Sequence, residues 1–105
     1  MLVVGSQKWE AQKAAWAVEA SFQNRLPTRV NRYRTLLAVQ AGLLSVVKTY
    51  RIEELPKSGR FSADKVHTSV CETDSATIRK GITYKIEYRD DFGRVIDRFE
   101  IDRCP

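Results

Sequence analysis

Residues 81–101, GITYKIEYRDDFGRVIDRFEI, form the stretch that decides the fold. From Ile82 to Tyr88 apolar and polar residues alternate, which is the period-two pattern of a half-buried strand. Asp90–Gly93 has the composition of a tight turn, in which Gly93 supplies a positive φ. The apolar positions of Val95–Ile101 complete a return strand. The C-terminal part of the chain therefore predicts a β-hairpin.

The N-terminal part predicts an amphipathic helix from Ser6 to about Leu26. Ser6 is a suitable N-cap, and Pro27 stops the helix. Apolar residues recur at helical spacing and form one continuous stripe. The stripe consists of Ala11, Ala15, Val18, Phe22 and Leu26.

Two tryptophans, Trp9 and Trp16, stand seven positions apart along the edge of this stripe. Placed on one side of a helix, they are candidates for a partner-binding patch. The alternative interpretation is that they cap a small hydrophobic core. The sequence leaves both interpretations open.

The middle of the chain predicts two strands, a loop and a second helix. We expect strands at Tyr33–Val39 and Leu44–Glu53, after a basic connector at Thr28–Arg32. Pro56–Gly59 marks a loop. A helix capped by Ser62 follows, with a restart near Thr73 or Asp74 and an end at Gly81.

The resulting order is α-β-β-α-β-β, which predicts an α+β fold: an antiparallel sheet of about four strands packed by two helices. With 105 residues and 12.1 kDa, residues 1–105 form a single domain. No apolar run approaches the roughly 20 residues of a membrane-spanning helix, so we expect no transmembrane segment in this chain. Residues 1–5 are expected to be flexible or to be the remnant of an N-terminal anchor lost upstream.

The net charge is +5, and most charges alternate in sign, as on a solvated face. The local excess, without intervening acids, consists of Arg25, Arg29, Arg32 and Arg34. This basic segment is a candidate interaction surface. Together with the strand tyrosines Tyr50, Tyr84 and Tyr88 it also raises the alternative of a cytosolic nucleic-acid-binding module. Glu87, between two of these tyrosines, argues against base stacking.

No catalytic constellation is evident. His67 is the only histidine, and nothing places a serine and an aspartate around it as a triad requires. Turn formation explains Asp90 and Asp91, and the glycines are isolated, so no phosphate-binding loop exists. We expect no catalytic residue, no metal site and no cofactor. A small hydrolase is the weakest hypothesis.

The two cysteines, Cys71 and Cys104, flank the hairpin and allow three interpretations: a disulfide, two unlinked thiols or part of a metal site. With His67 they supply at most three soft ligands, which makes the metal the weakest of the three.

The chain resembles a broad set of small bacterial envelope proteins that have no established activity and are commonly made with a signal peptide, a lipoprotein signal or an N-terminal membrane anchor. The resemblance covers about residues 20–105 and rests on the order and spacing of elements rather than on one motif. In the set, leucines usually occupy the helix after the first cysteine, where this chain has Ser75–Ile78. The shared elements are Leu26-Pro27, Val30, Thr35-Leu36, Val39-x-Ala41-Gly42, Thr49-Tyr50-Arg51-Ile52, Val70-Cys71, Gly81-Ile82, Tyr84-x-Ile86-x-Tyr88-x-Asp90, Gly93, Ile96 and Cys104.

The resemblance implies an exported domain with a Cys71–Cys104 disulfide, located in the periplasm, outside the cell or on a membrane that faces an oxidising compartment. It implies no reaction. The leading hypothesis is a non-enzymatic protein-interaction or assembly domain of the bacterial envelope, whose partner is another envelope protein. An accessory role in a secretion or pilus system is one specific form of this hypothesis.

Overall fold

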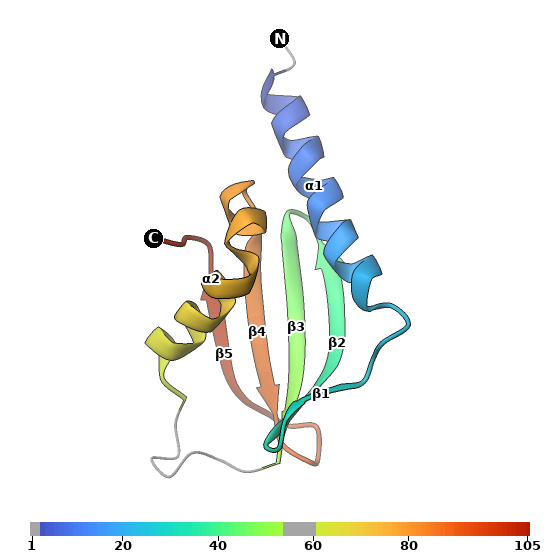
Figure 1. Ribbon diagram of the computed structural model, residues 1–105, viewed down its shortest axis with the longest axis vertical. Coiled ribbons are helices and arrows are strands. Elements are labelled where there is room, and N and C mark those ends of the chain that lie inside the picture. The colour runs from blue at the N-terminus through green and yellow to red at the C-terminus, as the bar shows by residue number, and fades with distance from the viewer. Residues whose placement is uncertain (1–2, 54–60) are drawn as a thin grey trace.

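The computed structural model describes residues 3–53 and 61–105 (Figure 1). Two helices and five strands follow one another along the chain. They are α1 (Val3–Phe22), β1 (Thr28–Asn31), β2 (Arg34–Gly42), β3 (Ser45–Ile52), α2 (Ala63–Arg79), β4 (Thr83–Arg89) and β5 (Val95–Ile101).

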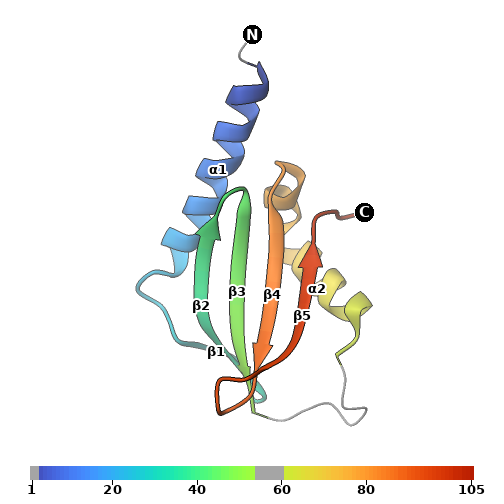
Figure 2. The same ribbon diagram turned by 180° about the vertical axis from the view of Figure 1, so that it is seen from behind.

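The five strands form one sheet in the order β1-β2-β3-β4-β5. Neighbouring strands pair antiparallel except β3 and β4, which run parallel, so that α2 serves as the crossover between them. Figures 1 and 2 show both helices on the same face of the sheet, α1 over β2 and β3 and α2 over β4 and β5. The fold is a two-layer α+β sandwich.

The predicted α+β class is confirmed, but the details of the sheet differ from the prediction. The sheet has five strands instead of about four, because Thr28–Asn31, expected to be a connector, pairs with β2 as β1. An all-antiparallel sheet was also expected, and the parallel pairing of β3 with β4 corrects this. Helix α1 begins at Val3 and ends at Phe22, so Ser6 lies inside it, and Val3–Gly5 are helical. Met1, Leu2 and the predicted loop 56–59 lie outside the described residues.

The core lies between the sheet and the helices. Its fully buried side chains come mainly from β4, and they include Tyr84, Tyr88 and Ile86. Helix α1 contributes Ala11 and Ala15, at 3% and 0% exposure, because small side chains let the helix approach the strands closely. The apolar side chains of the alternating segment 82–88 therefore face the helices and are buried, as the alternation predicted.

Local signals in the sequence place α2. The Ser62 hydroxyl accepts a hydrogen bond from the Lys65 amide, so the predicted N-cap is confirmed. The predicted restart appears as a kink at Asp74, whose φ of −122° is not helical. At the kink, the Asp74 carboxylate lies 3.3 Å from the ammonium of Lys48, which is only 9% exposed. This ion pair joins α2 to β3.

The disulfide between Cys71 and Cys104 is present, with 5.6 Å between the two Cα atoms, and it joins the middle of α2 to the chain after β5. Beside it, Nε2 of His67 lies 2.6 Å from the carbonyl oxygen of Arg103. The C-terminal residues are therefore held against α2 by a covalent bond and a hydrogen bond.

Replacing both cysteines by serine should lower the free energy of unfolding by about 3–4 kcal/mol, since the disulfide restricts a loop of this length in the unfolded chain. Urea unfolding followed by circular dichroism measures the loss. A reductant should lower the midpoint of the wild-type protein and leave that of the double variant unchanged. A wild-type midpoint that ignores the reductant would contradict this account.

Candidate functional site

An apolar groove of about 770 Å³ lies between α1 and the turn that joins β2 to β3. Figure 1 shows that α1 extends past this turn. Residues of α1 between Lys8 and Trp16 form one wall of the groove. The turn forms the other wall. The lining residues are Lys8, Trp9, Gln12 and Trp16 on the helix and Ala41, Gly42, Leu43 and Leu44 on the turn.

Gln12 ties the two walls together through both ends of its side-chain amide. Its Nε2 donates to the carbonyl of Gly42 at 3.0 Å, and its Oε1 accepts from the amide of Leu44 at 2.7 Å. Leu44 has a φ of +50°, an uncommon conformation for a leucine, and this hydrogen bond helps hold it there. Because Gln12 satisfies the Gly42 carbonyl and the Leu44 amide, these two groups need no partner from a molecule bound in the groove.

The apolar side chains at the groove are exposed. Trp9 and Trp16 pack edge to face, with ring centroids 5.6 Å apart, and remain 54% and 45% exposed. Leu43 at the tip of the turn is 88% exposed. The two tryptophans thus line the groove and leave about half of their surface accessible to solvent. Their role in binding a partner stays a prediction. The contribution of Gln12 and Leu43 was missed, because only the fold brings the turn against α1.

The four arginines of the basic segment do not converge on one site. Arg25 lies over the ring of Phe22 and Arg32 over the ring of Tyr33, with guanidinium-to-centroid distances of 5.6 and 5.5 Å. Arg34 lies over the ring of Tyr50, and it donates to the hydroxyl of Tyr88 on the helix-covered side of the sheet. The binding role of this segment stays a prediction.

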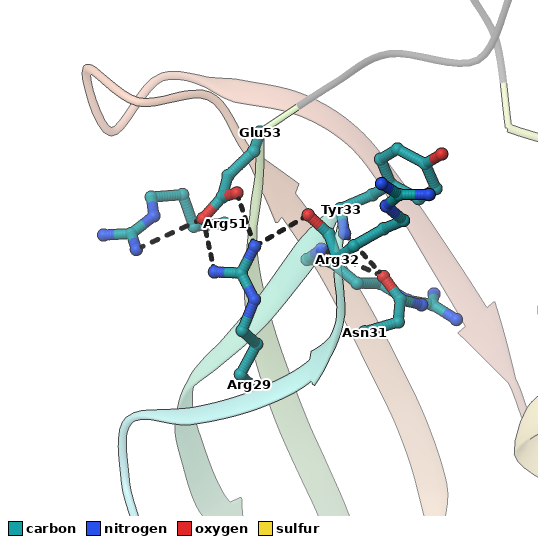
Figure 3. A network of polar contacts seen from close by, with 7 residues as sticks. Arg29, Asn31, Arg32, Tyr33, Arg51 and Glu53 are labelled. Atoms are coloured by element: carbon teal, nitrogen blue, oxygen red, sulfur yellow. Dashed lines mark hydrogen bonds and ion pairs between the residues drawn. The ribbon is translucent and has the colours of Figure 1, made fainter.

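Arg29, the fourth arginine, forms a paired contact with Glu53, shown in Figure 3. Its two terminal nitrogens lie 3.0 and 2.9 Å from the two carboxylate oxygens, and one of them also donates to the carbonyl of Arg32. The hydrogen bonds from Arg29 lower the pKa of the Glu53 carboxyl. Arg51 lies on the other side of the same carboxylate, at 3.8 Å.

A second glutamate, Glu87 on β4, is also held between two arginines. Nε of Arg89 donates to one carboxylate oxygen at 2.6 Å, and Nε of Arg98 donates to the other at 3.2 Å. The hydrogen bond from Arg89 is the main reason that the pKa of the Glu87 carboxyl is lowered.

The strand tyrosines are part of the core. Tyr84 and Tyr88 are 0% and 2% exposed, so their rings are not available to stack nucleic-acid bases. Burial raises the pKa of the half-buried Tyr50 to about 12.

The described part of the chain holds no group of three or more His, Cys, Asp and Glu side chains placed to bind a metal ion. None of its helices combines the length and the apolar character needed to cross a membrane.

No protein-family model matches the sequence, and no curated protein matches it significantly. The fold, in contrast, is similar to solved structures. The pilotin AspS of the type II secretion system of Vibrio cholerae superposes with a TM-score of 0.76 at 14% identity, over 93% of this chain and 94% of that one. The type 2 secretion pilotin EpsS of Vibrio vulnificus also has a TM-score of 0.76 at 14% identity, over 92% of both chains.

A third solved structure with this fold is a protein from Pseudomonas aeruginosa described as secreted. Its TM-score is 0.69 at 9% identity, over 91% of this chain and 92% of that one. The chain therefore has the two-layer fold found in these pilotins and in this protein, along almost its whole length.

Gln12→Ala should lower the free energy of unfolding by about 1–2 kcal/mol, because it leaves the Gly42 carbonyl and the Leu44 amide without their partner. It should also speed hydrogen exchange at the Leu44 amide. Gln40→Ala is the matched control, since Gln40 is exposed on β2, and its effect should stay below about 0.5 kcal/mol. Equal losses in both variants would mean that Gln12 does not secure the turn.

Glu87→Gln should make the free energy of unfolding depend less steeply on pH in the acid range. The folded-state pKa of Glu87 lies below its unfolded value, so its ionised form stabilises the protein fully above about pH 4.3, and this contribution is lost as the pH falls through the folded-state pKa. The difference between wild type and variant should therefore shrink in acid, as measured by urea unfolding at a series of pH values. Glu100→Gln, at an exposed position of the same face, should keep the wild-type slope.

Proposed function

We propose that this protein is a non-enzymatic accessory protein of a secretion apparatus in the bacterial envelope. In this role it binds an amphipathic helix of an envelope protein partner in the groove between α1 and the β2–β3 turn. The observation that carries the proposal is the groove itself, because it exposes Trp9, Trp16 and Leu43, while Gln12 holds the turn in place through the Gly42 carbonyl and the Leu44 amide. Exposed apolar surface of this kind is typical of an interaction site.

The compartment and the process are supported by two separate observations. The Cys71–Cys104 disulfide is typical of proteins that fold in an oxidising compartment, such as the periplasm. The likeness in fold to two pilotins of type II secretion systems favours an accessory role in secretion over other envelope processes.

The shape of the groove favours a helix as the ligand. On α1 the exposed Trp9 and Trp16 stand at positions i and i+7, which is the spacing of a helix face that packs along another helix. Lys8, which also lines the groove, offers a positive charge. We therefore infer a partner helix with apolar residues at the same spacing and an acidic residue near one end.

The alternative of a nucleic-acid-binding module has less support. It relied on tyrosines that are buried and on arginines that point to different sides of the sheet.

Intrinsic fluorescence can test the groove directly, because the chain contains only two tryptophans and both line it. Titration with a synthetic amphipathic helix of leucine and glutamate should shift the emission to shorter wavelength. Leu43→Ser should weaken binding about ten-fold or more, since it removes an exposed apolar contact. Phe92→Ser, at an equally exposed position in the β4–β5 turn, should leave binding unchanged. Equal effects of the two substitutions would refute the groove as the site.

A photo-crosslinking amino acid at position 43, introduced in the bacterium that makes the protein, tests the cellular role. The adduct identified by mass spectrometry should contain an envelope component of a secretion apparatus, whereas position 92 should not form it. Adducts with cytosolic proteins only would contradict the proposed compartment.

A further inference from the structure

The second face of the sheet carries an ordered set of charges. Among the described residues both helices lie on the opposite face, and Figure 2 shows the strands from the uncovered side. Side chains alternate between the two faces along each strand. Because Tyr84, Ile86 and Tyr88 point to the helices, Lys85, Glu87 and Arg89 point to the uncovered face.

The strand register aligns three arginines in one row across this face. Arg29 on β1 pairs with Thr35 on β2, Thr35 with Arg51 on β3, and Arg51 with Arg89 on β4. Neighbouring strands lie about 4.8 Å apart, so Arg51 and Arg89 are direct neighbours of like charge. Like charges placed side by side on adjacent strands destabilise a sheet.

Two glutamates flank the row without cancelling its charge. Glu53 lies between Arg29 and Arg51, and Glu87 lies between Arg89 and Arg98. The three arginines of the row and Arg98 carry four positive charges against two glutamates, which leaves a surplus of two. Lys85 and Glu100, which pair across β4 and β5 on the same face, add no net charge. The side chains of Arg51 and Arg89 are each 41% exposed, so each offers free surface to a ligand beside its contact with a glutamate.

A depression of about 300 Å³ adjoins the row at Glu87 and Arg98. Val47 contributes an apolar surface to it, and charged side chains of β4 and β5 form its rim. The uncovered face therefore offers a positive row beside an apolar contact. The depression is lined by Val47, Lys85, Ile86, Glu87, Arg98, Phe99 and Glu100.

We propose that the uncovered face binds an acidic segment of a protein partner, with carboxylates that meet Arg51 and Arg89. A guanidinium pairs well with a carboxylate, and an incoming acid relieves the repulsion between the two neighbours. A protein segment fits better than a polyanion that is charged at every unit, because apolar residues between its acids let carboxylates meet Arg51 and Arg89 while fewer negative charges lie near Glu53 and Glu87. The inference does not rest on the groove, which belongs to α1 and the β2–β3 turn.

Titration of the nitrogen-15-labelled protein with a short synthetic peptide of alternating glutamate and leucine tests the proposal. Amide signals of β1, β3 and β4 around the arginine row should move, whereas the indole signals of Trp9 and Trp16 should not. Arg51→Gln should weaken peptide binding about five-fold or more. Arg32→Gln is the matched control, since Arg32 is exposed and lies over Tyr33, and it should change the affinity less than about two-fold.

Thermal unfolding separates a binding role from a structural one. Arg51→Gln removes like-charge repulsion, and its loose contact with Glu53 leaves the Arg29–Glu53 pair in place, so the midpoint should stay the same or rise. No peptide binding at low salt, equal weakening by the two variants, or a marked fall of the midpoint would overturn the proposal. Tighter binding of phosphatidylglycerol vesicles or oligothymidylate than of the peptide would also overturn it, and would assign the row to phosphate groups.

Discussion

The parallel pairing of β3 with β4 forces the chain to return along the whole sheet between these strands. Ser45, at the start of β3, pairs with Thr83 at the start of β4, so the chain must travel back after Ile52. Helix α2 makes this return over one face, as the handedness of such crossovers requires. Because α1 covers β2 and β3 on that same face, no described helix is left for the other face, where the arginine row stands.

The crossover also explains how the C-terminus is held. With α2 lying over β4 and β5, Cys71 on the helix comes within disulfide distance of Cys104 after β5. The kink at Asp74 lets its carboxylate reach Lys48 on β3, so the same helix is tied at two points about one turn apart. Helix α1 has no such covalent tie. Hydrogen bonds of Gln12 tie it to the β2–β3 turn, and the same residue lines the groove.

The sequence predicted the elements that have strong local signals. The alternation of residues 82–88, the Gly93 turn and the Ser62 cap are confirmed, since each depends on neighbours in the chain. Strand β1 was missed because Thr28–Asn31 is short and mostly exposed and shows no alternation. The parallel pair was missed because nothing within either hairpin specifies which strands meet between them. The disulfide was expected only through the resemblance to envelope proteins.

The arginines show most clearly that the sequence alone does not reveal which charged residues lie together in the fold. Arg29 and Arg34 are close in sequence but point to opposite faces of the sheet, and Arg25 and Arg32 lie outside the strands. Arg51 and Arg89 are far apart in sequence, yet the parallel register makes them neighbours. The local excess of arginines in the sequence therefore predicted an interaction surface from residues that the fold separates. The concentration of positive charge arises from strand order, which is the feature that local patterns specify least.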